Sequence, residues 1–177
     1  MNIRFESTAI GAMPELDFRA LATSRDVSLP GELRPAFQGT GQGLANLERL
    51  LGGARCVTTG QQPGLFTGPI YTVYKALSAV ALARLFERRM GEPVVPVFWV
   101  GGDDHDLREA NHFYLLNSGH RIERVALSDR PLDAPMRPLY REPLGPDVGA
   151  ALEALSSAAP ETEFKASVLE WLGRHYV

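Results

Sequence analysis

Apolar residues in the first third of the chain show helical spacing over one short segment, Gly43–Leu51. Its leucines fall on one face: Leu44, Leu47, Leu50 and Leu51. The pair Gly52-Gly53 ends this helix, because glycine is favoured just beyond the last helical residue. Prolines and glycines break the remainder of residues 1–53 into short pieces, so we expect an irregular and partly helical lead-in.

The middle of the chain has the pattern of a strand followed by a long helix. β-Branched residues within Arg55–Thr59 favour a strand. The helix begins near Pro69, whose missing N–H costs nothing in a first turn, and ends at Gly91. Its apolar residues recur at helical spacing: Ile70, Val73, Tyr74, Leu77, Val80 and Ala81.

A second strand is predicted over Val94–Val100, a continuous apolar run typical of a strand covered on both faces. This interpretation places Phe98 and Trp99 in the core. Pro96 disfavours pairing near the start, so the well-paired part is expected from Val97. Strand, helix and strand in this order predict a βαβ unit with parallel strands and a right-handed crossover.

The rest of the chain is predicted to hold a hairpin and two helices. FYLLNSGHRIERVAL is typical of a β-hairpin turning at Asn117–His120. After a proline-rich loop, helices are expected at about 147–158 and 161–176, separated by Pro160. The fold class is therefore α/β over residues 54–177, with the hairpin and helices inserted after 112. Because α/β sheets normally have four or more strands, two parallel strands indicate an incomplete domain.

Composition narrows the class of protein. The chain has 177 residues, 45% of them hydrophobic and 22% charged, with a net charge of −3. These values are typical of a soluble globular protein and disfavour a dedicated nucleic-acid binder. The sequence also has no apolar run long enough for a membrane span. The first residues lack a signal-peptide core, so we expect a cytoplasmic location. A single cysteine, Cys56, excludes an internal disulfide and is expected to be a small buried group.

Two polar loops follow the two predicted parallel strands, at 60–69 (GQQPGLFTGP) and 101–112 (GGDDHDLREANH). In an open α/β sheet, ligands bind at the carboxyl ends of the strands. The βαβ order puts both loops at that edge, facing one crevice. This pairing is the strongest functional indication in the sequence.

The first loop is predicted to bind an anion. Gly60, Gly64 and Gly68 permit tight backbone whose free N–H groups can face a phosphate or carboxylate. Thr67 is expected to cap the following helix, whose N-terminus favours negative charge. Lys75, on the Tyr71 face of that helix, could reach the ligand. The alternative is a well-capped helix with a solvated lysine.

The second loop is predicted to carry acid–base chemistry. Asp106 and Glu109 fit an aspartate version of a capping box, a purely structural role. Asp104 and His105 are left unexplained by it, and a histidine beside a carboxylate transfers protons near neutral pH. If helical, His105, Glu109 and His112 would share a face that suits a metal, although no HExxH motif or second cluster supports one.

The two loops together resemble a known family. TTGQQPGLFTGPIYTVYKALSAVALA followed by PVFWVGGDDHDLREANH closely resembles the cysteine ligases of bacillithiol biosynthesis, over about residues 55–125. The likeness continues more loosely to the final VLEWLGRHY segment. It implies a Rossmann-like, nucleotidyl-transferase-like core similar to that of class I aminoacyl-tRNA synthetases. In this family the core carries connective domains and a coiled coil that forms a homodimer.

The resemblance implies a reaction and a set of site residues. The family is thought to add L-cysteine to glucosaminyl-malate, and forming that amide needs activation, for which ATP is the natural agent. His105, oriented by Asp104 or Asp106, would handle the amine proton. The first loop would hold a phosphate or the malate carboxylates, with charge added by Lys75. The full set of expected binding residues is Gly60, Gln61, Gln62, Gly64, Thr67, Gly68, Tyr71, Lys75, Asp103 and His112.

Two departures from the family matter. Gly101-Gly102-Asp103 replaces its usual small and acidic stretch, leaving Asp104, His105 and Asp106 in place. The family's proteins are also much longer, and this chain resembles only their N-terminal part, so a second chain could supply the missing half. Two alternatives therefore stay open: a non-catalytic, anion-binding remnant, and a metal-dependent hydrolase using His105, Glu109 and His112.

Overall fold

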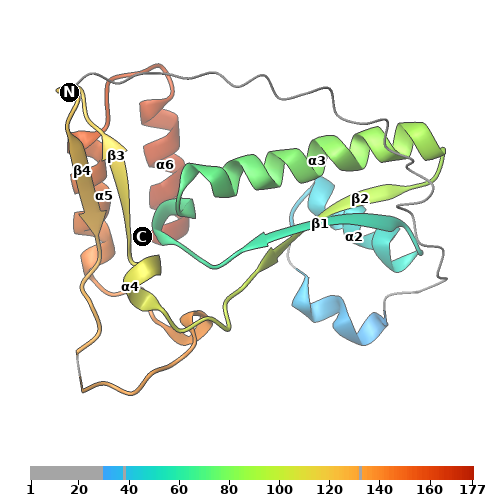
Figure 1. The fold of residues 1–177 in the computed structure, drawn as a ribbon, viewed down its shortest axis with the longest axis horizontal. Helices are drawn as coiled ribbons and strands as arrows, with labels where there is room; N and C mark the ends of the chain where they lie inside the picture. The colour runs from blue at the N-terminus through green and yellow to red at the C-terminus, as the bar shows by residue number, and fades with distance from the viewer. Residues whose placement is uncertain (1–29, 38, 132) are drawn as a thin grey trace, which may run out of the picture. The chain divides into compact units, whose positions relative to one another are not determined.

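A computed structural model describes residues 30–37, 39–131 and 133–177 of the chain (Figure 1). Along the chain the helices and strands are η1 (Gly31–Ala36), α2 (Gln42–Leu51), β1 (Arg55–Gln61), η2 (Leu65–Thr67), α3 (Ile70–Met90), β2 (Val94–Val100), α4 (Leu107–Ala110), β3 (His112–Leu116), β4 (Ile122–Ala126), η3 (Leu139–Arg141), α5 (Asp147–Ala158) and α6 (Lys165–Tyr176), where η marks a 3₁₀ helix. Two compact units share these elements. One takes in the described residues up to Cys56 together with Leu82–Val95, and the other comprises Val57–Ala81 and Pro96–Val177.

The predicted strand–helix–strand order is confirmed. β1 and β2 form a two-stranded sheet. The N–H of Arg55 donates to the Pro93 carbonyl before β2, and the N–H of Gly101 after β2 donates to the Gln61 carbonyl that ends β1. The first residues of β1 and β2 are therefore neighbours, and so are their last residues, which means that the two strands run parallel. β2 is a strand from Val94 onwards, so the weakening expected from Pro96 does not delay it.

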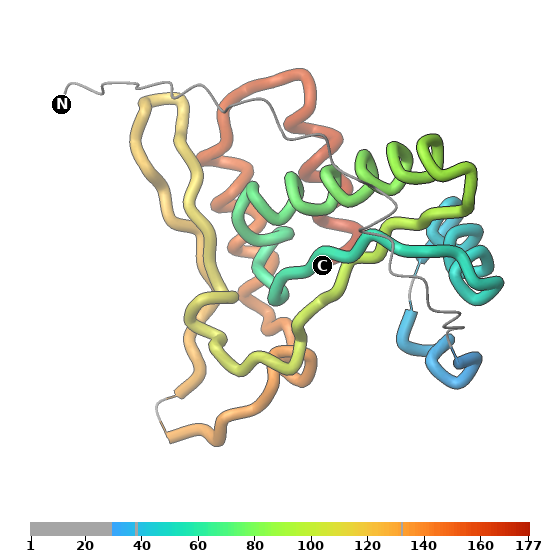
Figure 2. The backbone as a smooth tube through the Cα atoms, turned by 45° about the vertical axis from the view of Figure 1, so that its right-hand side comes forward, coloured from blue at the N-terminus to red at the C-terminus, as the bar shows by residue number. Residues whose placement is uncertain are grey.

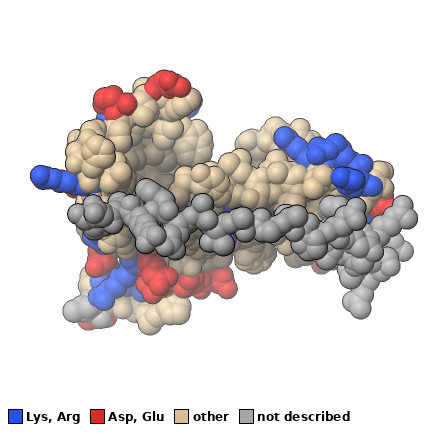
Figure 3. Space-filling view, turned by 45° about the horizontal axis from the view of Figure 1, so that its top comes forward, with Lys and Arg blue, Asp and Glu red and all other residues tan. Residues whose placement is uncertain are grey.

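The long helix has the predicted limits. Gly91 follows α3 with a φ of 69°, the left-handed conformation that ends helices. Arg88 and Arg89 occupy its last turn, where cations interact favourably with the helix dipole. Figure 3 shows basic side chains, in blue, gathered over this end of the helix.

In the first unit, α2 ends where the sequence predicts, at Leu51 before Gly52. Leu47 on this helix is buried, and Arg49 forms an ion pair with Glu87 of α3. The predicted boundary between residues 1–53 and 54–177 stays a prediction, because residues 1–29 lie outside the described part of the chain.

The second unit contains the hairpin and the C-terminal helices (Figure 2). β3 and β4 pair antiparallel from His112 opposite Ala126 to Leu116 opposite Ile122. The Asn117 side chain closes the turn by accepting the N–H groups of Gly119 and Arg121, as the hairpin prediction requires. β4 and α6 each pack against α5. The buried core of this unit consists of Leu65, Phe66, Val125, Val148, Ala151 and Leu172.

Two expectations about burial are wrong. Phe98 and Trp99 are 37% and 69% exposed, because only the start of β2, at Val94 and Val95, is covered. Cys56 is exposed, since it lies on the uncovered side of β1. The apolar positions of α3 at Ile70, Val73, Tyr74 and Leu77 are also exposed, whereas Ala79 and Ala83 are the buried residues of this helix.

No helix in the described residues is long and apolar enough to cross a membrane.

A pair of glycine substitutions tests the packing of β1 on β2. A Cβ on Gly60 would lie 2.7 Å from the Trp99 carbonyl oxygen, whereas a Cβ on Gly149 in α5 meets nothing within 4 Å. We expect Gly60→Ala to lower the free energy of unfolding by about 1–3 kcal/mol through overpacking. Gly149→Ala should raise it by about 0.5–1 kcal/mol, because alanine loses less entropy in a helix. Urea denaturation followed by circular dichroism measures both, and equal effects would contradict the assigned close contact.

A second prediction concerns acid stability. Asp147 Oδ2 accepts the backbone N–H of Ser128 at 2.6 Å, and this hydrogen bond lowers the pKa of Asp147 below its usual value. Since the folded pKa is depressed, the stabilisation is present above the unfolded pKa and is lost as the pH falls through the folded one. Asp147→Asn should therefore be less stable than wild type near neutral pH, with the difference shrinking towards about pH 3. Thermal denaturation across this range measures it, and a constant difference would count against the assignment.

Candidate functional site

The two loops predicted to share a crevice do meet. The N–H of Gly101 donates to the Gln61 carbonyl at 3.0 Å, so both loops start side by side at the carboxyl ends of β1 and β2. Farther along, Gln62 Nε2 donates to Glu109 Oε2 at 2.9 Å. Backbone and side-chain hydrogen bonds thus join loop 60–69 to loop 101–112.

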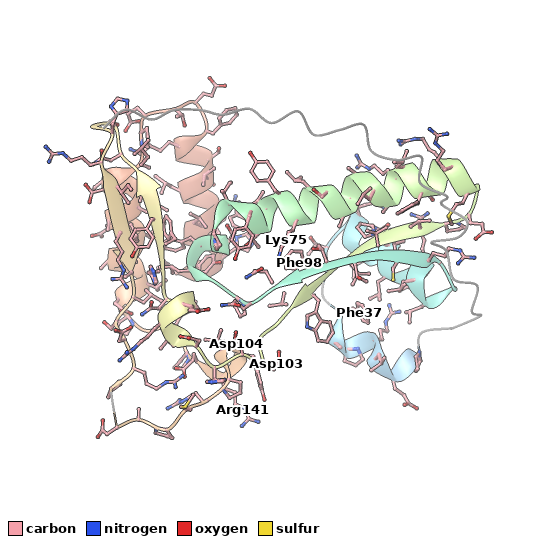
Figure 4. The ribbon with its side chains drawn as sticks, viewed as in Figure 1. Phe37, Lys75, Phe98, Asp103, Asp104 and Arg141 are labelled. Atoms are coloured by element: carbon pink, nitrogen blue, oxygen red, sulfur yellow. The ribbon has the colours of Figure 1, made fainter. Side chains whose placement is uncertain are left out.

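Lys75 holds the end of β1. Its Nζ donates to the Gly60 carbonyl at 3.2 Å and to Gln61 Oε1 at 2.8 Å, and it lies 5.2 Å from the centre of the Tyr71 ring. Gln61 Nε2 in turn donates to the Tyr71 hydroxyl at 3.1 Å. Both the oxygen and the nitrogen of the Gln61 side-chain amide are therefore hydrogen-bonded. The ammonium group of Lys75 is bonded to acceptors of the protein itself, near the start of α3 (Figure 4).

The turn before α3 is built from strained backbone. Phe66 has φ 48° and ψ 50°, Thr67 has φ 77° and Gly68 has φ 72°. Gly64 is required for another reason, because a Cβ there would lie 2.8 Å from the Gly68 Cα. Positive φ at three successive residues reverses the chain so that α3 can start at Ile70.

Two expectations for this turn are corrected. Thr67 does not cap α3, because Gly68 after it is not helical and the helix starts only at Ile70. Its N–H donates instead to the Tyr176 hydroxyl at 3.2 Å. The N–H of Gly68 closes the 3₁₀ turn on the Leu65 carbonyl at 2.9 Å, so it is not free to face an anion.

A cavity of about 290 Å³ lies between the loops. Its polar lining combines two amides, a phenol, a carboxylate and an imidazole. The residues that line it are Gln61, Gln62, Pro63, Gly64, Gly68, Pro69, Tyr71, Glu109 and His112. Small ligand sites are of about this size.

A second, more open cavity of about 460 Å³ shares Gln61 and Gln62 with the first. Trp99, Gly101, Asp103 and Asp104 complete its lining. Figure 4 shows Asp103 and Asp104 in the loop that follows β2, near the segment that carries Arg141. The acidic part of the second loop therefore faces this larger space.

The side chains of Asp104 and Asp106 accept hydrogen bonds from backbone N–H groups. Asp104 Oδ1 accepts the backbone N–H groups of His105, at 2.6 Å, and Asp106, at 3.2 Å. Asp106 Oδ1 caps α4 by accepting the N–H of Glu109 at 3.2 Å, which confirms the structural half of the predicted capping box. The exposed His105 is thus held by its main chain.

The helical face that would suit a metal does not form. α4 ends at Ala110, and His112 begins β3, so His105, Glu109 and His112 do not lie on one helix. Within residues 30–37, 39–131 and 133–177, no three His, Cys, Asp or Glu side chains are grouped as metal ligands.

His112 has a fixed partner. Its Nδ1 lies 3.1 Å from Oδ1 of Asn111, a residue only 2% exposed, and its ring meets the Tyr114 ring edge-on at 5.3 Å between centres. Of the two histidines in loop 101–112, His112 lines one of the two cavities described here and His105 lines neither.

Sequence reasoning missed three residues that shape the site. The Asn111 side chain bonds the His112 ring, and the Tyr176 hydroxyl accepts the N–H of Thr67. Tyr140 packs against Gly102, where a Cβ would lie 3.1 Å from the tyrosine Cβ. Only Asn111 has a local signal, as a polar residue directly before a strand. The tyrosines come from distant parts of the chain, and nothing in their neighbouring residues indicates these contacts.

Comparison with known proteins gives the family. The model of the bacillithiol biosynthesis BshC N-terminal Rossmann-like domain matches residues 31–177. A relative from Symbiobacterium thermophilum, named "Putative cysteine ligase BshC", is 40% identical over 72% of this chain and 23% of its own length. Relatives of the same name from Desulforamulus reducens and Chlorobaculum tepidum are 37% and 36% identical, over 88% and 94% of this chain.

The chain spans about a quarter of the length of these relatives, 23–29%. The matched segment includes both loops and both cavities described above. The expected Rossmann-like class is confirmed, and the resemblance seen in the two loops extends over most of the chain. The chain therefore belongs to the BshC family, and its residues 31–177 correspond to the family's N-terminal Rossmann-like domain.

Proposed function

We propose that this domain supplies the substrate cavity of a ligase that joins the carboxyl group of L-cysteine to the amine of glucosaminyl-malate in bacillithiol biosynthesis. Relatives named as cysteine ligases support the reaction class. The observation that carries the proposal is the cavity between the two loops. It brings the Glu109 carboxylate and the His112 imidazole together with the amides of Gln61 and Gln62.

The lining suits an amine better than an anion. Glu109 contributes a negative charge to the smaller cavity, and Asp103 and Asp104 contribute two to the larger one. Lys75, the cation near the end of β1, is engaged by Gly60 and Gln61. A carboxylate in a small cavity favours an ammonium group, which both cysteine and glucosaminyl-malate carry.

ATP is proposed as the activating agent, since a carboxylate does not form an amide in water without activation. The described cavity residues do not fit its triphosphate, because they include carboxylates and the Gly68 N–H is already bonded. We therefore assign no step of the reaction to nucleotide contacts in these loops. In this proposal the rest of the longer relatives, or a second chain, supplies those contacts, and the active form is a homodimer in the cytoplasm.

A second candidate function is a non-catalytic binding module. It is favoured by one observation: the carboxylates of Asp104 and Asp106, expected to orient the His105 imidazole, accept backbone N–H groups instead. Such a module would bind a substrate in the same cavity without turning it over.

The test of the proposed function is product formation. The purified chain is combined with the remaining part of a full-length relative and incubated with L-cysteine and glucosaminyl-malate, with and without ATP, and the products are identified by mass spectrometry. We expect a cysteinyl amide that depends on ATP and on both substrates. Binding of a substrate without product, while a full-length relative turns over in the same buffer, would favour the module.

The role expected of His105 is tested separately. General acid–base residues contribute about 10²–10⁴-fold to rates, so His105→Ala should lower product formation by about that factor if its imidazole handles the amine proton. The stability should be little changed, because the described contacts of His105 are made by its backbone. Initial rates at saturating substrate measure this, and normal turnover would remove His105 from the mechanism.

A further inference from the structure

Asn111 lies in a hydrogen-bond network that fixes its orientation. Its Nδ2 donates to the Leu127 carbonyl at 3.2 Å and to Asp129 Oδ1 at 2.7 Å. Both partners are acceptors, so the NH₂ group has to face them. The opposite orientation would place the side-chain oxygen of Asn111 against these two acceptor oxygens. The NH₂ group would lose both acceptors at a buried position, and an unsatisfied buried donor costs free energy.

This orientation determines the tautomer of His112. With Nδ2 facing Leu127 and Asp129, Asn111 Oδ1 is the atom that lies 3.1 Å from His112 Nδ1. Since Oδ1 only accepts hydrogen bonds, Nδ1 must carry the proton. The neutral ring then has its lone pair on Nε2, and the edge-on contact with Tyr114 restrains the ring.

The groups around His112 suit a primary amine. It lines the smaller cavity with Glu109 of α4 and Tyr71 of α3. Glu109 receives a hydrogen bond from Gln62, which holds the carboxylate at the cavity. A carboxylate and a nitrogen lone pair on the lining of one cavity together attract an ammonium group and offer it a proton acceptor.

We propose that His112 Nε2, in place of His105, accepts the proton of the amine that attacks in the ligation, and that Asn111 is its positioning residue. His105 lines neither of the two cavities. This inference rests on the proposed function, in which the amine belongs to glucosaminyl-malate. One proton passes from the ammonium nitrogen to Nε2, and the nitrogen keeps the electron pair that forms the C–N bond to the activated cysteine carboxyl. The C–O bond to the activating group derived from ATP breaks as the amide forms, that group leaves with the electron pair, and the second nitrogen proton is released to solvent. The imidazolium is stabilised by its Nδ1–H bond to Asn111, by the charge of Glu109, and by Asp129 beyond the amide.

The tautomer is measured by long-range ¹H–¹⁵N NMR on the full chain. The His112 signals are identified by their loss in His112→Asn, whose amide keeps a donor towards Asn111 but has no basic nitrogen. We expect the neutral ring to be protonated on Nδ1. A ring protonated mainly on Nε2 would overturn the proposal.

Asn111→Ala tests the positioning role. It should abolish the preference for the Nδ1–H tautomer, because the acceptor that fixes it is removed. If this buried variant does not fold, the wild-type tautomer still decides the question. A folded variant that keeps the wild-type tautomer would contradict the role of Asn111.

Turnover gives the second readout. His112→Asn should lower product formation by about 10²–10⁴-fold. The matched control is His120→Asn, in the hairpin turn, where a φ of 56° suits asparagine. Its rate should match wild type, and a His112→Asn rate within about twofold of wild type would overturn the inference.

A ligand-binding experiment distinguishes failure of the proposed function from failure of this inference about His112. If wild type makes no product, glucosaminyl-malate is titrated against the His112 ¹⁵N signals. A saturable shift of Nε2, absent in spectra with malate alone, supports His112 as the acceptor for the amine. The lack of any shift overturns it.

Discussion

The shape of the site depends on how Phe66 is held. Its left-handed backbone costs about 1–3 kcal/mol for a bulky residue. Burial of the side chain contributes about 1.5–3 kcal/mol. Its edge-on contacts with Phe113 and Tyr176, at 5.9 and 5.1 Å between ring centres, each add about 0.5–1.5 kcal/mol. The turn that starts α3 is therefore stabilised by a strand and a helix far along the chain. The Tyr176 hydroxyl also accepts the N–H of Thr67, so α6 holds the first loop although it lines neither cavity.

Local patterns were enough to predict the elements but not their burial. α3 and the β3–β4 hairpin have the limits that Gly91 and Asn117–His120 indicate, because turn residues act through neighbouring backbone. The exposure of Phe98 and Trp99 was missed, because an apolar run shows that a strand needs cover and not whether the chain provides it.

The candidate site was predicted in part for a similar reason. Parallel strands bring loops 60–69 and 101–112 to one edge, which topology alone ensures. The partners of individual side chains are set by contacts across the fold. Lys75 is engaged by Gly60 and Gln61, and Asp104 bonds main-chain N–H groups. The buried bond from Asn111 to Asp129, which gives His112 its orientation, joins residues 18 positions apart, and no motif indicates it.

The position of Trp99 gives the protein an internal optical reporter. Its indole is 69% exposed and lines the larger cavity beside Gln61 and Asp104. The chain has two tryptophans, and the other, Trp171 on α6, stacks at 4.4 Å on His175 and lines neither cavity. Indole emission shifts with the polarity of its surroundings. A molecule that enters the larger cavity therefore alters the fluorescence of Trp99 while that of Trp171 serves as a reference, so occupancy can be followed without a label.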